Sequence, residues 1–180
     1  MRPLDKDSAA RAIDGLALEP GNRTLAQYWL SLWRGDALPP RAALSPAQMK
    51  RFLPLILLLD TVPEKSVTIR LAGTHYRKAL GTELTGQDWI ALAPPAYRAE
   101  RLRIFSEIAR GAVGVGHRHV PLTYDPDYVC EEIVLPFAAD DDGSSPVLVH
   151  VNWRRESYAQ ARSVPQALGD PLDFRLCALA

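Results

Sequence analysis

Hydrophobic and polar residues follow their clearest pattern within residues 53–86. An apolar run at 55–59 is closed by Asp60, and its length suits a buried strand but is far too short to cross a bilayer. After a turn at 62–65, three hydrophobic residues recur at every second position: Val67, Ile69 and Leu71. This is the period of a strand with one buried face, so the pattern predicts a β-hairpin.

An amphipathic helix is expected before this hairpin, over residues 24–34. Its apolar positions recur at helical spacing, and they are Leu25, Tyr28, Trp29, Leu32 and Trp33. Thr24 and Gln27 have the spacing of a capping box, and Gly35 is expected to stop the helix. A second helix start is predicted at 45–48 and must end before Pro54.

Past the hairpin, the pattern predicts a short helix over 75–80, stopped by Gly81, and a long helix over about 96–110. Three strands then follow at 115–123, 128–138 and 146–153. Together these elements predict an α+β fold: a five-stranded antiparallel sheet with helices between its second and third strands.

Short motifs occur in a fixed order along the chain. They are Tyr28-Trp29, Pro40-Arg41 to Pro46, Leu53-Pro54 to Asp60, Arg70 to Thr74, and Gly81 to Gly86. This order, over roughly residues 25–153, resembles a compact bacterial branch of the PAS sensory domains. The resemblance implies a PAS-like five-stranded antiparallel sheet with helices on one face, preceded by a helical extension. It also implies a sensory module that binds a small ligand or a protein partner.

The expected organisation is a single domain with extensions. Residues 1–21 are predicted to form a flexible arm with at most a short helix, 22–52 a helical extension, 53–155 the PAS-like domain and 156–180 a tail. No kinase, cyclase or DNA-binding segment is recognised, so we expect any signal to pass through a dimer or another protein.

Composition limits the classes of partner. The chain has 180 residues, with 21 basic and 21 acidic side chains, which leaves no overall field to attract nucleic acid or an anionic membrane. The only cysteines, Cys130 and Cys177, fit neither a disulfide framework nor a zinc site. We therefore expect a cytoplasmic protein that binds neither nucleic acid nor membrane.

A ligand pocket is expected between the sheet and the helices that follow Gly73, since short helices cannot fill the concave face of the sheet alone. Its expected walls are Arg70, His75, Tyr76, Trp89 and Phe105. Arg70 is also placed to pair with Asp60 across the hairpin. The expected core of the sheet consists of Leu57, Leu59, Ile69, Leu71, Ile133, Leu135, Val149 and Val151, covered by Phe105 and Ile108.

The aromatic stripe of the helix at 24–34 must be covered. It could lie on its own sheet or pair with the same helix of a second subunit, and the dimer is the favoured prediction. Its interface would consist of Leu25, Tyr28, Trp29, Leu32 and Trp33.

His117 and His119 alternate on a predicted strand, so they share one face and could hold a metal. With Gly111 they match the first part of a cupin metal motif, but the required glutamate comes only at Glu131, and the second motif is missing ahead of His150. The alternative, which we favour, is that these histidines lie on the surface or form hydrogen bonds in the sheet, and no metal site is assigned.

No cofactor is identified. His75 departs from the position of haem ligands in PAS proteins, and neither Cys130 nor Cys177 is placed for a flavin adduct, so haem and flavin are not supported. The chain also lacks the motifs of nucleophilic, phosphate-binding or paired-carboxylate enzymes. The sequence therefore predicts a non-enzymatic PAS-type sensory or interaction module. A small metal-dependent enzyme using His117 and His119, and a purely structural dimerisation module, remain as alternatives.

Overall fold

The computed structural model describes residues 5–120, 128–155 and 171–178. The helices are α1 (Lys6–Asp14), α2 (Pro20–Ser31), α3 (Thr74–Leu80) and α4 (Arg98–Ala109), with 3-10 turns η1 (Arg41–Ala43), η2 (Leu53–Leu55) and η3 (Pro95–Tyr97). The strands are β1 (Ile56–Val62), β2 (Ser66–Ala72), β3 (Ala112–Val120), β4 (Tyr128–Pro136), β5 (Ser145–Arg155) and β6 (Pro171–Ala178).

The strands form one antiparallel sheet in the order β2-β1-β5-β4-β3-β6. The predicted five strands are all present, and α3 and α4 connect β2 to β3. The sheet has a sixth strand, β6, within the segment predicted as a tail. It pairs with β3, and its alternate residues Phe174 and Leu176 pack against the core on the α4 side. Alternating apolar residues therefore make part of this segment an edge strand.

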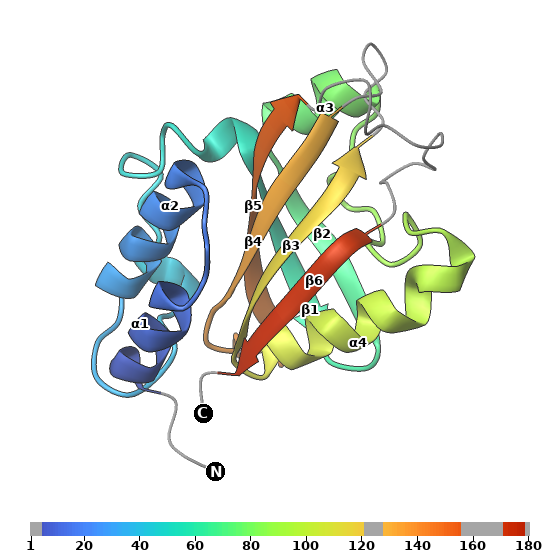
Figure 1. Cartoon of the computed structure of the whole chain (residues 1–180). Helices are drawn as coiled ribbons and strands as arrows, with labels where there is room; N and C mark the ends of the chain where they lie inside the picture. Colours follow the sequence, from blue (N-terminus) through green and yellow to red (C-terminus); the bar gives the residue numbers. More distant parts are fainter. Residues whose placement is uncertain (1–4, 121–127, 156–170, 179–180) are drawn as a thin grey trace.

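Helices cover both faces of the sheet, rather than one (Figure 1). The pair α1 and α2 lies on one side, and α4 lies on the other. Along β4, Ile133 and Leu135 belong to the hydrophobic cluster under α1 and α2, whereas Val134 belongs to the cluster under α4. The sheet is thus the middle of three layers, and the N-terminal helices supply the third.

The apolar stripe of α2, continued by Leu32 and Trp33 directly after the end of the helix, packs on this chain's own sheet. Leu25 and Trp29 are fully buried, Trp33 is 3% exposed and Leu32 is 9% exposed, while Tyr28 is partly buried. Trp29 Nε1 donates a hydrogen bond to the carbonyl of Pro136 at 2.9 Å, which ties the helix to the end of β4. The expected dimer interface is therefore not available on these side chains, and a dimer would need another surface.

Two predicted helix starts are wrong. The helix α2 begins at Pro20, since proline has the right φ for a first helical position, and Thr24 donates to the carbonyl of Pro20 instead of capping. Residues 46–52 form turns rather than a helix. In contrast, Gly81 ends α3 with φ 69°, as predicted for a left-handed C-cap.

All of the predicted core residues are buried except Leu71, which is 44% exposed. The register between β1 and β2 shifts by one residue, so Leu59 pairs with Ile69 while Leu58 pairs with Leu71. A β-bulge of this kind turns the following side chain to the other face. Leu71 thereby leaves the core that Ile69 enters.

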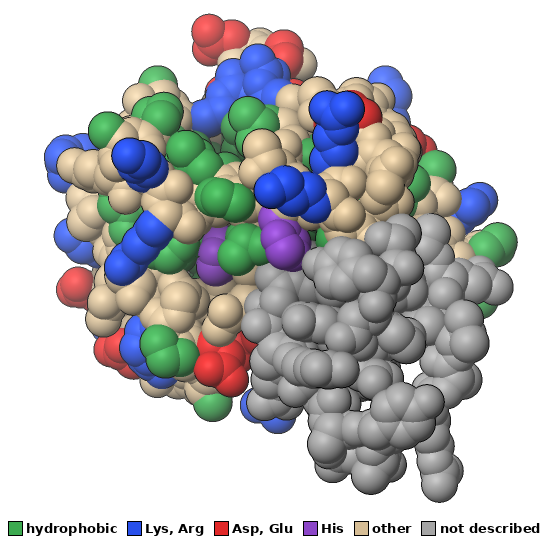
Figure 2. All heavy atoms as spheres, turned by 90° about the horizontal axis from the view of Figure 1, so that it is seen from above, with side chains coloured by type: hydrophobic (Ala, Val, Ile, Leu, Met, Phe, Trp, Pro, Cys, Tyr) green, Lys and Arg blue, Asp and Glu red, His purple; other side chains and the backbone are tan. Residues whose placement is uncertain are grey.

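Lys and Arg side chains are scattered among neutral and hydrophobic groups on the face seen in Figure 2, and they do not merge into a single patch. This distribution agrees with the formal net charge of +0. Among the described residues, none of the helices has both the length and the apolar character needed to cross a membrane.

Candidate functional site

Three of the expected pocket residues meet in the core between the sheet and α4. Tyr76 comes from α3, Phe105 from α4 and Trp89 from the connection between these helices; their exposed fractions are 3%, 2% and 3%. Trp89 and Phe105 form an edge-to-face pair with ring centroids 6.1 Å apart. The Tyr76 hydroxyl lies 3.5 Å from the carbonyl of Leu55, which links α3 to the start of the sheet. Three of the five predicted wall residues therefore lie in one hydrophobic cluster, and their role in ligand binding stays a prediction.

The indole nitrogen of Trp89 is one of three buried side-chain polar atoms, with Trp33 Nε1 and Thr61 Oγ1, that have no hydrogen-bond partner in the described residues. A buried donor left unpaired costs about 1–3 kcal/mol, so such groups are rare and often mark a site for a ligand or water. Trp89 thus presents a hydrogen-bond donor within an aromatic environment.

Arg101 was not predicted as a site residue. It is 7% exposed, its Nη1 donates to the carbonyl of Trp89 at 3.1 Å, and its guanidinium carbon lies 4.9 Å from the centre of the Trp89 ring. Arg101 precedes Phe105 by four residues and so lies on the buried face of α4, which is the signal that could have identified it. A cationic group and the indole donor therefore lie together in this core.

Arg70 lies apart from these aromatic residues. Arg70 pairs with Asp60 at 2.8 Å, as predicted, and Asp60 also contacts Arg41, which in turn reaches Asp140 at 3.0 Å. Asp60 follows the buried Leu59 on β1, so strand alternation places this ion-pair cluster on the opposite face of the sheet from Trp89. The position of Arg70 therefore does not support its predicted role as a pocket wall.

His75 is partly buried on α3. Burial lowers its pKa below the usual value, with a further contribution from nearby Lys78. A neutral imidazole is therefore favoured at neutral pH.

A second polar cluster lies on the α2 side of the sheet and is centred on the buried carboxylate of Glu131. The backbone N–H of Glu19 donates to both carboxylate oxygens, at 2.9 and 3.2 Å. Asn22 Nδ2 donates to Glu131 Oε1 at 2.7 Å and to the Glu131 carbonyl at 3.2 Å. The side chain of Glu19, the N-cap residue of α2, makes no capping hydrogen bond. The Glu131 carboxylate on β4 instead accepts hydrogen bonds at this helix terminus.

His150 completes this cluster. Its Nδ1 lies 2.6 Å from Asn22 Oδ1, and the amide of Asn22 already donates to Glu131, so His150 must donate through Nδ1. Burial lowers the pKa of His150 to about 4. The ring also packs edge-on against Phe52, with centroids 5.3 Å apart. His150 is therefore a neutral structural side chain at neutral pH.

The proposed metal-binding histidines are only partly described. His117 Nε2 lies 3.6 Å from Glu131 Oε2, and the side chain of His117 is 33% exposed. The side chain of His119 lies outside the described residues. In the part of the chain that is described, no group of three side chains is arranged to hold a metal ion. His150 therefore bonds to Asn22 on α2, and His117 lies within ion-pair distance of Glu131 on the neighbouring strand β4.

The sheet is antiparallel, α3 and α4 lie between its second and third strands, and an aromatic core lies beneath them. This arrangement fits a PAS-like α+β fold. The family model of the PAS domain matches residues 18–149, so the chain belongs to the PAS domain family. Neither the curated proteins nor the solved structures contain a match.

Proposed function

We propose that this chain is a PAS-type sensory module that binds a small organic ligand between the sheet and α4, beside Trp89. The ligand has an apolar or aromatic body and a hydrogen-bond acceptor directed at Trp89 Nε1. The module is not an enzyme; ligand binding alters how it contacts a second copy or another signalling protein.

The unpaired indole donor of Trp89 supports this proposal most directly. An acceptor on a ligand would satisfy it, and Tyr76 and Phe105 would surround the body of that ligand. Arg101 packs over the same ring and donates to the Trp89 carbonyl, which holds the indole in one orientation. Small-molecule sites in proteins combine apolar walls with a few polar groups.

A route from this core to the N-terminal helices runs through β4. Glu131 and Glu132 are neighbours on the strand and both are buried. Successive side chains on a strand face opposite sides, so Glu132 faces the α4 layer while Glu131 holds α2. A ligand that shifts β4 would therefore change the position of α2 on the sheet. The surface of α1 and α2 is thus the proposed output surface.

Native mass spectrometry of the purified full chain tests the proposal. We expect a noncovalently bound small molecule in the wild type that is absent under denaturing conditions, and lower occupancy in Trp89→Phe, which keeps the ring contacts but removes the N–H. Trp33→Phe is the matched control, since Trp33 Nε1 is also buried and unpaired but lies in the α2-side cluster.

Equal occupancy in the wild type and both variants would contradict the role of Trp89. A wild type that carries no small molecule would favour a module that binds only proteins.

A further inference from the structure

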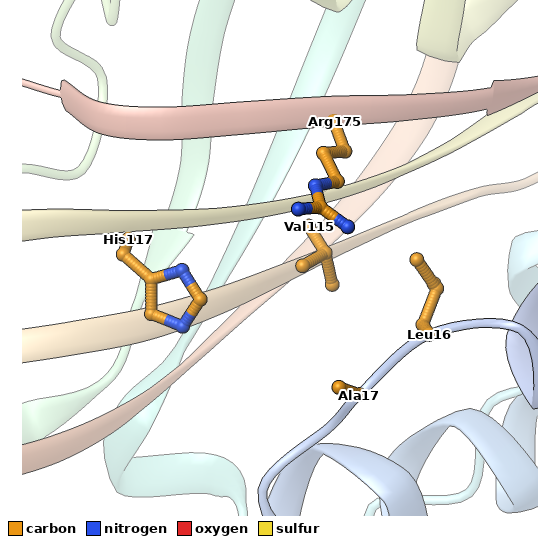
Figure 3. A pocket seen from close by; sticks show the side chains of 5 residues that line it. All are labelled: Leu16, Ala17, Val115, His117 and Arg175. Carbon is orange, nitrogen blue, oxygen red and sulfur yellow. The ribbon is translucent and has the colours of Figure 1, made fainter.

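A separate cleft of about 110 Å³ lies on the α1 and α2 side of the sheet. Its lining residues are Leu16, Ala17, Val115, His117 and Arg175 (Figure 3). Val115 belongs to the hydrophobic cluster under α1 and α2, whereas Trp89 belongs to the cluster under α4. The sheet therefore separates this cleft from the ligand site proposed above.

The polar side of the cleft comes from two adjacent strands. Arg175 on β6 is the register partner of Val115 on β3, and His117 follows two residues later on β3. Figure 3 shows the guanidinium group of Arg175 close above Val115, between His117 and Leu16 in this view. Arg175 is exposed, and within the described residues no carboxylate forms an ion pair with it. A planar guanidinium in such a setting suits a carboxylate, to which it can donate two parallel hydrogen bonds.

Glu131 is a carboxylate near this cleft, since its Oε2 lies 3.6 Å from His117 Nε2. Its oxygens already accept hydrogen bonds from the backbone of Glu19 and the amide of Asn22. These donors, at the N-terminus of α2, stabilise its negative charge. The anionic group therefore belongs at the Arg175 end of the cleft, away from Glu131.

The remaining walls are apolar. Leu16 and Val115 are each 6% exposed, and Ala17 adds a methyl group from the loop between α1 and α2. A cavity of about 150 Å³ holds a molecule the size of benzene, so this smaller space suits a chain of a few carbon atoms. A dianion such as phosphate would leave the apolar walls unused and bring more charge toward Glu131.

We propose that the cleft binds a small aliphatic monocarboxylate of about the size of propionate, with its carboxylate on Arg175 and its alkyl chain between Leu16 and Val115. Arg23 Nη2 donates to the carbonyl of Leu16 at 3.0 Å, so the loop that forms this wall is tied to α2. Binding there joins the loop to β3 and β6. The cleft is then a second input, which acts on the N-terminal helices from their own side of the sheet, opposite the site beside Trp89.

The test is a titration of the isotope-labelled full chain, followed by the backbone amide signals, with sodium propionate, propylammonium chloride and inorganic phosphate at constant ionic strength. Propionate is expected to cause saturable shifts at Ala17 and Val115, and the cation of equal size is not. Arg175→Gln is expected to weaken propionate binding about tenfold or more, since it removes a charge-assisted pair. Arg103→Gln is the matched control, because Arg103 is an exposed arginine that pairs with Glu100 on α4.

Several results would overturn the proposal. These are a wild type without saturable shifts in propionate, an Arg175→Gln variant that binds propionate as tightly as the wild type, and phosphate binding that is equal or tighter. The amide signals of α4 and β5 report whether each variant keeps the native fold, so a loss of binding with an unchanged spectrum elsewhere is assigned to the cleft.

Discussion

Asn22 Nδ2 and Glu131 Oε1 are joined by a buried hydrogen bond of 2.7 Å although the two residues are 109 positions apart in the chain. Asn22 lies in the first turn of α2, and Glu131 lies in the middle of β4. This contact, together with the bond from the Glu19 N–H, fixes the angle at which the N-terminal helices meet the sheet. Few polar groups could replace it, since both side chains are nearly inaccessible to water.

Glu131→Ala should lower the free energy of unfolding by about 2–3 kcal/mol, because it removes the cap of α2 and leaves the amide of Asn22 unpaired in the core. Chemical denaturation followed by circular dichroism measures the change. Glu100→Ala, which breaks an exposed pair with Arg103, should change stability by less than about 1 kcal/mol. Equal losses in the two variants would show that Glu131 does not hold the helix.

His150 should make stability depend on pH in acid. Burial lowers its pKa from 6.5 to about 4 in the folded chain, so below pH 6.5 the unfolded chain binds a proton that the folded chain does not. The contribution of His150 to the free energy of unfolding is thus fully present above pH 6.5. It is lost as the pH falls toward 4, and the total loss from this group is about 3 kcal/mol. Urea denaturation of the wild type and of His150→Gln across this interval gives the measurement.

The control for this pH effect is His75→Gln, since His75 is less buried and its pKa is lowered less strongly. The wild type and His75→Gln should lose stability with similar slopes, while His150→Gln should show a flatter slope. A His150→Gln variant with the slope of the wild type would assign the acid sensitivity to other groups.

The core residues of the β1–β2 hairpin and of strands β3 to β5 were predictable because strand periodicity is a local property of the sequence. Ile69 and Leu135 are buried as their alternation predicts. Leu71 continues the same alternation but is exposed, since the bulge between β1 and β2 depends on pairing that the periodicity of one strand does not encode.

The polar part of the candidate sites was less accessible to prediction. The role of Glu131 depends on its hydrogen bond to Glu19 at the N-terminus of α2, which is 112 positions away in the chain. No local sequence pattern indicates this role. The aromatic stripe of α2 was correctly identified as needing cover, yet the stripe is the same whether a second subunit or the chain's own sheet provides it. Only the three-dimensional arrangement distinguishes these cases.

The neighbouring positions Ile69 and Leu71 offer a test of the bulge. Ile69→Ala should cost about 2–4 kcal/mol, because it leaves a cavity in the α4-side core, while Leu71→Ala should cost less than about 1 kcal/mol. Denaturant unfolding of the two variants measures both values. Similar costs at the two sites would mean that the strand keeps a regular register and buries Leu71.

Gly73 should not tolerate a side chain. A Cβ added there would overlap the carbonyl oxygens of Leu53 and Pro54 in η2, and these are backbone atoms that cannot rotate away. Gly73→Ala is therefore expected to cost about 1–3 kcal/mol through overpacking, measured by thermal and denaturant unfolding. Gly15→Ala is the control, since the nearest atoms to its added Cβ are at 3.5 and 3.6 Å, an ordinary contact distance. A Gly73→Ala variant as stable as the wild type would show that η2 can move away from the end of β2.

The last prediction concerns whether α2 serves the chain's own core or a dimer. Trp29 is fully buried and bonded to Pro136, so Trp29→Glu places a charge in the core and should abolish the cooperative unfolding transition of the native fold. Gln27→Glu, on the exposed side of the same helix, should leave the fold intact. Circular dichroism and light scattering at several concentrations, applied to both variants and the wild type, give the measurement. If the Trp29→Glu chain folds normally and is monomeric while the wild type is a dimer, α2 forms the interface between subunits and not the core of its own chain.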